Sequence, residues 1–302
     1  MREKAVKFGK TAALTGILVE PTGELDQSRP AFVIVNSGIM HRIGTCRISV
    51  MISRAAADAG FLALRFDLSG IGDSGPRKDS LPFEQSAPRE AQEAMDYLTA
   101  SKGVKTFIMM GLCSGADMSY ETSLLDERAV GLMQIDAYAY RNWKWYVKHY
   151  GPRMRQLDTW KRFAGRVRAK VEEKYLGKTA PAKDAEDLEL PSYVRVFPPV
   201  DSIREGLRKL TARKLHFFYI YTGDEQAYNY PGQHQDVFAD VDFGGRLRCE
   251  YLKEADHIVT GLDHQQYVTR EIAAWAARIW PAAAQSRGAS PTRPTNGAAA
   301  RA

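Results

Sequence analysis

Segment 111–115, which reads Gly-Leu-Cys-Ser-Gly, holds the residues best suited to do chemistry. An apolar run ends just before it, and a stretch with helical character, about residues 116–126, follows it. A strand, a nucleophile between two glycines and a helix, in this order, are typical of a nucleophile elbow, a sharp turn that presents the central side chain to a pocket. The flanking glycines have no Cβ, so they allow the tight turn. The pattern predicts that Cys113 is a nucleophile, with the free N–H groups of the helix start beside its sulfur.

Two alternatives accompany this interpretation. A buried cysteine is usually only a small apolar residue, and the segment taken alone leaves that possibility open. Ser114, the neighbouring hydroxyl residue, is the other candidate nucleophile. It lies one position past the apex of the turn, so we expect its side chain to point away and its backbone N–H, rather than its hydroxyl, to take part.

A nucleophile of this kind needs a base, and the base needs a group that holds its tautomer. In hydrolases with such an elbow the chain order is nucleophile, acid, histidine. Asp224 follows the apolar run 215–221, and His257 follows the run 247–252. Ligands bind at the carboxyl ends of the strands in open α/β sheets, so we predict Asp224 as the acid and His257 as the base. Glu225 is the main rival of Asp224, whose shorter side chain directly after a glycine is better placed.

The other histidines are less suitable as the base. His216 lies inside a predicted strand and favours the core, whereas His149 belongs to a predicted insertion. His234 and His264 are expected at the surface.

Acyl chemistry also needs N–H donors for the substrate oxyanion. The backbone N–H of Ser114 is one candidate, because it follows the nucleophile. The backbone N–H of Ile39 is the second, since a Ser-Gly pair before it follows the apolar run 31–35. A plain turn at this place is the alternative. His41 and Arg42 come shortly afterwards and are candidates to contact a polar group of the substrate, although a structural role for Arg42 fits equally well.

Strand and helix patterns alternate along most of the chain. Such interleaving predicts an α/β fold with a mostly parallel eight-stranded sheet flanked by helices. The predicted strands are 5–8, 14–19, 31–35, 61–66, 106–110, 130–135, 215–221 and 247–252, and the main predicted helices are 47–59, 87–101, 116–126 and 266–279.

Residues 136–200 break this rhythm, being first aromatic and basic and then acidic with several prolines. An excursion of this length is too long for a plain loop in a compact domain, so we expect a helical cap or lid. The end of the chain is rich in Ala, Pro, Arg, Ser and Thr and is expected to be disordered. The predicted parts are a core at 1–136 and 201–281, a cap at 137–200 and a disordered tail at 282–302.

The composition is that of an ordinary globular protein, with 302 residues, 44% hydrophobic and 26% charged. Three cysteines without a CxxC pair favour free thiols in a reducing compartment, so we expect a cytoplasmic protein without a metal or other cofactor. No segment has the length of a membrane span or the form of a signal peptide, and we expect neither a membrane nor a nucleic-acid partner. The net charge of +6 is partly due to a basic aromatic stretch in the insertion, for which a solvated helical face is a simpler explanation than an anionic partner. The sequence leaves the oligomeric state open.

These features together resemble the α/β-hydrolase superfamily over about residues 5–280. Residues 67–74, Asp-Leu-Ser-Gly-Ile-Gly-Asp-Ser, are similar to the D-x-x-G-x-G-x-S loop that follows the fourth strand in this family. The Ser-Gly pair before Ile39 occupies the place of the family's His-Gly oxyanion loop. Cysteine replaces the serine of most members. In this departure the chain resembles dienelactone hydrolases and hydrolases associated with exosortase and exopolysaccharide systems. The serine-aminopeptidase-like members of the superfamily are also similar.

The resemblance implies an enzyme that cleaves an ester or thioester through a Cys-His-Asp triad and an acyl-enzyme. The expected partner is a small-molecule acyl substrate, including a thioester of a carrier protein or of coenzyme A. Tyr138 and Trp143 are candidates to cover its acyl group, although they could instead form the cap's own core. The same acyl-cysteine would serve an acyltransferase or a product-releasing thioesterase of a biosynthetic pathway, and a non-catalytic binding protein is the third alternative.

Overall fold

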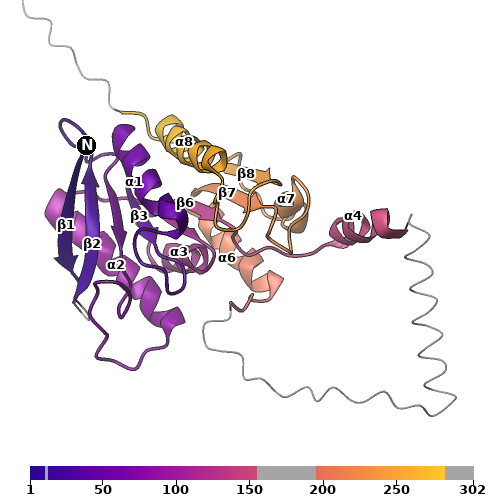
Figure 1. Ribbon diagram of the computed structural model, residues 1–302, viewed down its shortest axis with the longest axis horizontal. Helices are drawn as coiled ribbons and strands as arrows, with labels where there is room; N and C mark the ends of the chain where they lie inside the picture. The colour runs from indigo at the N-terminus through magenta and orange to yellow at the C-terminus, as the bar shows by residue number, and fades with distance from the viewer. Residues whose placement is uncertain (11–12, 155–194, 283–302) are drawn as a thin grey trace, which may run out of the picture.

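Eight strands form one continuous sheet in the computed structural model, which describes residues 1–10, 13–154 and 195–282 (Figure 1). Their order across the sheet is β1-β2-β4-β3-β5-β6-β7-β8. The first two pairings, β1 with β2 and β2 with β4, are antiparallel, and all others are parallel. The predicted mostly parallel eight-stranded sheet is therefore confirmed. The strands are β1 Arg2–Phe8, β2 Leu14–Glu20, β3 Ala31–Val35, β4 Ala63–Phe66, β5 Phe107–Leu112, β6 Ala129–Ile135, β7 His216–Thr222 and β8 Leu247–Leu252.

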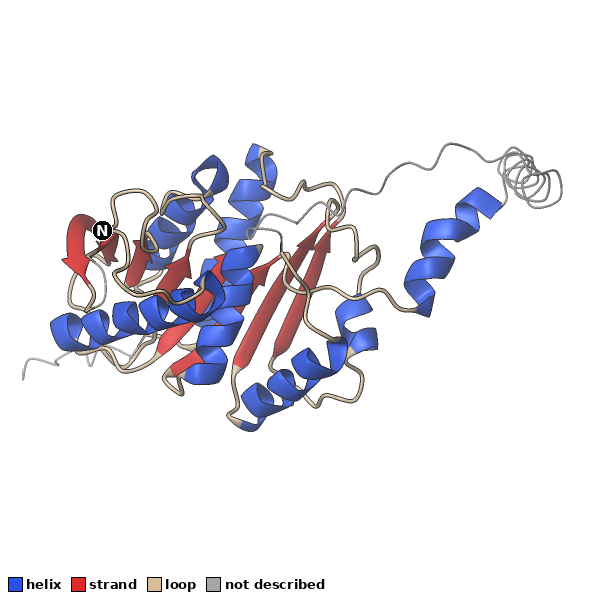
Figure 2. Cartoon of the chain, turned by 90° about the horizontal axis from the view of Figure 1, so that it is seen from below, coloured by secondary structure: helices blue, strands red, loops and turns tan. Residues whose placement is uncertain are grey.

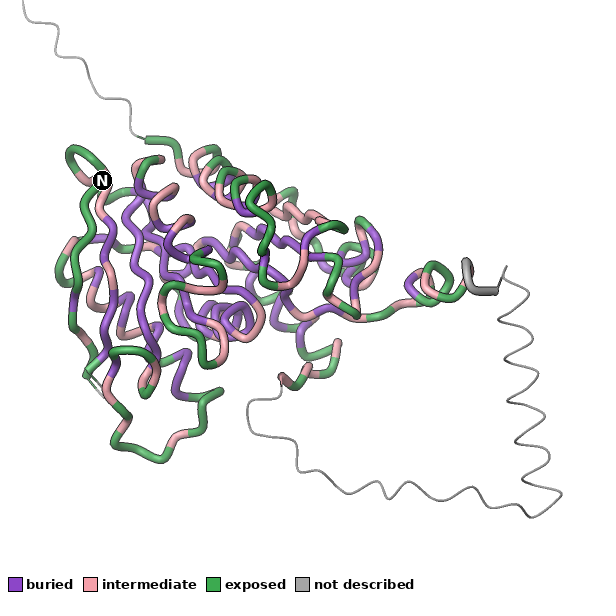
Figure 3. Tube along the Cα trace, in the orientation of Figure 1, coloured by how far each residue is buried: buried purple, intermediate pink, exposed green. Residues whose placement is uncertain are grey.

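The central strands are buried on both faces, as Figure 3 shows. Every residue of β3 and β5 is buried, which explains their continuous apolar sequences. The two faces of the sheet form separate apolar clusters. One cluster holds residues of α1 (Ile48–Asp58) and α8 (Leu262–Ile279), and the other holds residues of α2 (Phe83–Lys102), α3 (Ser114–Leu125) and α6 (Val200–Ala212). Helices therefore cover both faces of the sheet (Figure 2).

The helix boundaries differ from the prediction at two places. Both α2 and α8 begin about one turn before the predicted starts at residues 87 and 266. Their first turns contain exposed residues, so the apolar spacing that marks a buried helix face begins only later. Two short helices, η1 (Thr45–Arg47) and α7 (Gln233–Val237), were not predicted, because elements of this length leave little periodic signal.

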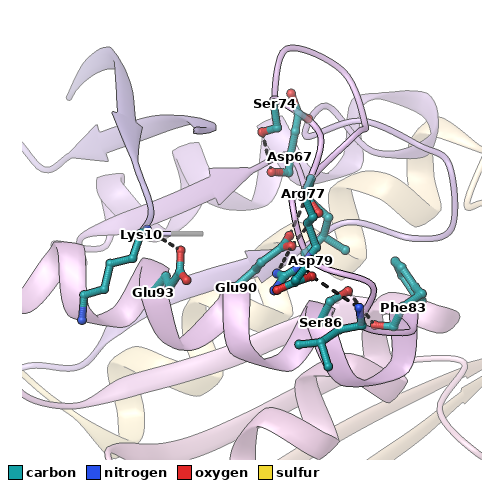
Figure 4. Close-up of polar contacts among 12 residues, drawn as sticks. Lys10, Asp67, Ser74, Arg77, Asp79, Phe83, Ser86, Glu90 and Glu93 are labelled. Atoms are coloured by element: carbon teal, nitrogen blue, oxygen red, sulfur yellow. Dashed lines mark hydrogen bonds and ion pairs between the residues drawn. The ribbon is translucent and has the colours of Figure 1, made fainter. Parts of the chain in front are cut away.

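The long connection between β4 and α2 is attached to the body of the protein by a buried acid (Figure 4). Glu90 on α2 is 1% exposed and accepts hydrogen bonds from Ser69 and from Arg77 Nη1 at 2.6 Å. At the start of the connection, Ser74 Oγ donates to the backbone oxygen of Asp67 at 2.7 Å. These contacts fix the loop that includes Ile71 and leads into α2 at Phe83, two residues that line the pocket described below.

The predicted cap is described only at its two ends. At the first end, α4 (Trp143–Met154) extends away from the sheet (Figures 1 and 2). The second end, residues 195–199, returns to the body and leads into α6. Residues 155–194, most of the predicted cap, and residues 283–302, nearly all of the predicted tail, lie outside the described residues.

Candidate active site

Cys113 lies at the sharp turn between β5 and α3. Its backbone has φ 55° and ψ −123°, a conformation that residues with a side chain rarely adopt and that is found at functional sites. A Cβ on Gly111 would lie 2.1 Å from the carbonyl carbon of Gly115, and a Cβ on Gly115 would lie 2.6 Å from the backbone oxygen of Val35. Both glycines are therefore required by the packing of the turn, as the sequence pattern predicted.

His257 contacts a buried carboxylate and interacts with Cys113. Its Nδ1 is 2.6 Å from Oδ2 of Asp136, and the Cys113 side chain interacts with the same ring. These two interactions, with Asp136 making the larger contribution, outweigh partial burial and raise the pKa of His257 to about 10. The raised pKa favours the imidazolium form, in which Nδ1–H donates to Asp136. A positive charge at this place stabilises a thiolate.

The carboxylate at the ring belongs to Asp136 and not to the predicted Asp224. Asp136 follows β6 directly, has φ 49° and is fully buried. Thr222 holds it from the end of β7, because its backbone N–H donates to Oδ1 and its hydroxyl donates to Oδ2, each at 2.7 Å. Among the described residues, Oδ2 of Asp224 accepts a hydrogen bond from the backbone N–H of His257, at 3.3 Å, and none from its ring.

The strand order explains why the prediction of Asp224 was wrong. β6 lies between β5 and β7, so the end of β6 is one strand nearer to Cys113 than the end of β7. Asp136 and Asp224 each follow an apolar run that forms a strand. The position after a strand, which was the reason for choosing Asp224, therefore applied equally to Asp136. The rival Glu225 does not contact the ring either; one of its oxygens accepts from the backbone N–H of Ala227 at 3.0 Å.

The loop 37–40 is attached directly to the elbow. The backbone N–H of Gly38 donates to Ser114 Oγ at 2.7 Å, and the Ser37 hydroxyl donates to the backbone oxygen of Leu112. Gly38 has φ 47°, and the N–H of Met40 closes the turn on the oxygen of Ser37 at 2.8 Å. The Ser114 hydroxyl therefore has a structural partner in the loop, whereas Ile39 follows Gly38 at its exposed tip, with a side chain 85% exposed.

A pocket of about 390 Å³ begins beside Ser114 and the loop 37–40. Its wall is mainly apolar, and it also includes one ion pair between Asp117 and Arg195. The apolar lining residues are Ile39, Ile71, Phe83, Met118, Tyr138 and Val196.

Arg195 brings a fixed positive charge to this pocket. Its Nε and Nη2 donate to the two oxygens of Asp117, each at 2.6 Å. The guanidinium carbon lies 5.3 Å from the ring centre of Tyr138 and 4.6 Å from that of Phe197. Burial disfavours its charged form, but the carboxylate of Asp117 more than offsets this and raises the pKa of Arg195; the Cys113 side chain contributes in the same direction. The sequence analysis missed both residues, because they are 78 positions apart and neither belongs to a motif.

The predicted substrate contacts divide into three cases. Tyr138 lines the pocket, and its contact with a substrate stays a prediction. Arg42 instead forms ion pairs with the carboxylates of Asp67 and Asp73, which is the structural alternative. His41 is exposed and Trp143 is 70% exposed on α4, and neither lines this pocket.

His234 is a further correction, because it is buried and not at the surface as expected. Its Nδ1 lies 3.0 Å from the Tyr221 hydroxyl, and burial lowers its pKa to about 3. This ring is neutral and belongs to the core.

Three observations bear on other kinds of site. Cys46, Cys113 and Cys249 are all free thiols. Within the part of the chain that the structure describes, no group of three or more His, Cys, Asp or Glu side chains is arranged to hold a metal ion. None of the described helices combines the length and the apolar character that crossing a membrane requires.

Comparison with known proteins gives similarity at the level of structure alone. No protein-family model matches the sequence, and no curated protein matches it. Est1E of Butyrivibrio proteoclasticus, in a structure with bound ferulic acid, is similar with a TM-score of 0.58 and 12% identity over 90% of this chain and 98% of that one. The α/β hydrolase GrgF of Penicillium sp. sh18 is similar with a TM-score of 0.56 and 15% identity over 92% and 99% of the two chains. XC6422 of Xanthomonas campestris, a serine hydrolase without a lid, is similar with a TM-score of 0.53 and 14% identity over 93% of this chain and 97% of that one. With its sheet order, its elbow and these similarities, the chain has the α/β-hydrolase fold.

Proposed function

We propose that this protein hydrolyses a carboxylic ester or thioester, with Cys113 as nucleophile, His257 as proton donor and acceptor, and Asp136 as the group that orients the ring. The observation that supports this most directly is the 2.6 Å contact between His257 Nδ1 and Asp136, on a ring that also interacts with the Cys113 side chain. A charged ring that bridges a sulfur at a strained turn and a fully buried carboxylate is the arrangement that thiolate chemistry needs.

The first half of the reaction forms an acyl-enzyme. The Cys113 thiolate attacks the carbonyl carbon of the substrate, and a carbon–sulfur bond forms. The oxyanion accepts hydrogen bonds from the backbone N–H groups of Ser114 and Ile39. When the bond to the leaving group breaks, the His257 imidazolium gives its proton to the departing alkoxide or thiolate and becomes neutral.

The second half returns the enzyme to its starting state. Neutral His257 takes a proton from a water molecule, whose oxygen attacks the thioester carbonyl. The carbon–sulfur bond breaks, the acid leaves, and Cys113 is again a thiolate beside an imidazolium. Asp136 remains ionised throughout and holds the Nδ1–H of the ring.

Esters and thioesters suit this site better than amides do. The thiolate is itself a good leaving group, so the tetrahedral intermediate of an amide would expel sulfur rather than nitrogen. Est1E and XC6422, which share the fold, are respectively a protein with bound ferulic acid and a serine hydrolase. Those descriptions concern those proteins, but they agree with acyl chemistry on this scaffold.

The test is covalent labelling with an activated aryl ester such as p-nitrophenyl acetate. Intact mass during turnover should show one acetyl group per chain in the wild type and none in Cys113→Ala. Cys46→Ala is the matched control, because Cys46 is an exposed thiol, and its labelling and turnover should equal those of the wild type. Retained labelling and turnover in Cys113→Ala would refute the proposed nucleophile.

The same experiment separates hydrolysis from acyl transfer. If water is the acceptor, added alcohols or amines should leave the yield of free acid almost unchanged. Diversion of most of the acyl group to such an acceptor would instead identify an acyltransferase. A wild type that neither turns over nor becomes labelled would favour a binding protein.

A further inference from the structure

The pocket beside the elbow contains a guanidinium edge to which the described residues supply no hydrogen-bond partner. Arg195 uses Nε and Nη2 for its two 2.6 Å hydrogen bonds to Asp117. Its remaining nitrogen, Nη1, has a carboxylate oxygen of Glu225 at 4.0 Å, which is too long for a hydrogen bond. An arginine carries five N–H donors in a fixed fork. The edge formed by Nη1 and the outer hydrogen of Nη2 is therefore still able to donate.

The direction of this edge is fixed before any substrate arrives. The rings of Tyr138 and Phe197 lie within 6 Å of the guanidinium carbon, and the paired Asp117 side chain is only 4% exposed. A stacked and paired guanidinium loses little conformational entropy when it forms one more hydrogen bond. Arg195 and Tyr138 also line the pocket that begins at Ser114, the residue after Cys113. An acyl group on Cys113 that enters this pocket would approach this edge.

The surrounding charges indicate what this edge accepts. The positive charge of Arg195 is already balanced by Asp117, and that of His257 by Asp136. Two further acidic side chains are close by: Glu225 lies 4.0 Å from Nη1 of Arg195, and Glu84 lines the same pocket. A substrate carboxylate would be repelled by this environment, whereas a neutral carbonyl or hydroxyl oxygen can accept a charge-assisted hydrogen bond without that penalty.

We propose that Arg195 determines substrate specificity by donating to a neutral oxygen acceptor on the acyl chain, so that the preferred acyl groups are oxygenated rather than plain alkyl chains. This inference rests on the proposed function, because it places the acyl group on Cys113. It makes Arg195 a substrate-recognition residue, with the Asp117 carboxylate as its positioning partner.

The test compares p-nitrophenyl esters of equal chain length, from five to eight carbons. One series has plain alkyl chains, a second carries a ketone at the penultimate carbon, and a third ends in a carboxylate. The measured quantity is the ratio of kcat/KM between matched esters. The wild type should prefer the ketone ester by about 10-fold or more at one or more lengths, mainly through KM.

Removing Arg195 alone would leave Asp117 buried without a partner and could unfold the protein. The variant is therefore the double replacement Asp117→Leu with Arg195→Met, which removes both charges together. It should lose the preference for the ketone ester, whereas Arg195→Lys should retain part of it. Arg141→Met is the matched control, because Arg141 lies over the Trp145 ring and lines a different pocket; it should keep the full ratio.

Three results would overturn the inference: no preference at any length, a preference that survives in the double variant, or a stronger preference for the carboxylate series. Failure of the proposed function gives a different result, namely no turnover of any ester. In that case calorimetric binding of the same esters to Cys113→Ala decides the matter. Tighter binding of the ketone ester that depends on Arg195 would support the inference, and equal binding of the matched esters would overturn it.

Discussion

The replacement Asp136→Asn tests the assignment of the acid most directly. An Asn side chain has the same shape, so its oxygen can still accept from the backbone N–H of Thr222. Its NH₂ group, however, would face Nδ1 of His257, where the carboxylate Oδ2 now lies at 2.6 Å. The ring would then accept at Nδ1, and the imidazolium beside Cys113 would lose its main support. The variant should fold and should contain far less of the imidazolium form of His257.

The size of the effect follows from the environment of the ring. A pKa of about 10 in place of 6.5 corresponds to about 5 kcal/mol in favour of the imidazolium. The His257 side chain is 34% exposed, so solvent screens part of this interaction. We therefore assign about 2–3 kcal/mol to Asp136, which is the largest of the causes. Loss of that amount lowers kcat/KM by about 10²-fold.

The assay is kcat/KM for an alkyl ester, together with an NMR titration of the His257 ring. Asp136→Asn should lower both kcat/KM and the pKa of His257. Asp224→Asn is the matched control, since Asp224 accepts from the backbone N–H of His257 and not from its ring, and it should change the rate by less than about 3-fold. Circular dichroism and thermal unfolding verify that both variants fold. A folded Asp136→Asn variant with more than a third of wild-type activity, or an Asp224→Asn variant with the larger loss, would refute the reasoning.

Four other changes give separate expectations. Because the pKa of His257 is raised to about 10, the ring keeps its proton up to that pH. In a pH–rate profile, kcat/KM for alkyl esters should therefore fall as the pH rises through about 10. In Asp136→Asn the same fall should occur at lower pH. Cys113→Ser should fold normally, but its acylation rate, measured by stopped flow, should fall about 10²-fold or more, because a serine hydroxyl does not ionise beside the imidazolium as a thiol does. Full activity of Cys113→Ser, combined with an inactive Ser114→Ala, would make Ser114 the nucleophile. Ser114→Ala should by itself lower kcat about 3–10-fold, because the N–H of Gly38 loses its 2.7 Å acceptor and the loop that carries Ile39 loosens. An unchanged kcat would show that this loop takes no part in the mechanism. Gly115→Ala should lower the free energy of unfolding in urea by about 1–3 kcal/mol, because the new Cβ would lie 2.6 Å from the backbone oxygen of Val35. An unchanged midpoint of urea unfolding would show that the elbow tolerates a side chain.

The local features of this protein could be predicted from its sequence because each depends on neighbouring residues. Apolar runs such as 31–35 and 107–112 form strands since they are buried on both faces, and all eight predicted strands are present. The elbow at Cys113 could also be predicted, because its glycines are needed within five residues of chain. His257 could be placed at the same sheet edge as Cys113, because both follow parallel strands at their carboxyl ends.

The partners of these residues were decided by the tertiary structure. Asp136 and Asp224 have equivalent positions after neighbouring strands, and only the order of β5, β6 and β7 and the path of the loop after β8 bring Asp136 to the His257 ring. Arg195 joins Asp117 across 78 positions, through a return of the chain that no local pattern specifies. Strands, helices and turns follow from short-range sterics and burial, which a sequence carries in its spacing. Contacts between distant side chains depend on how whole elements pack, so the choice of the acid and the charge in the pocket emerged only in three dimensions.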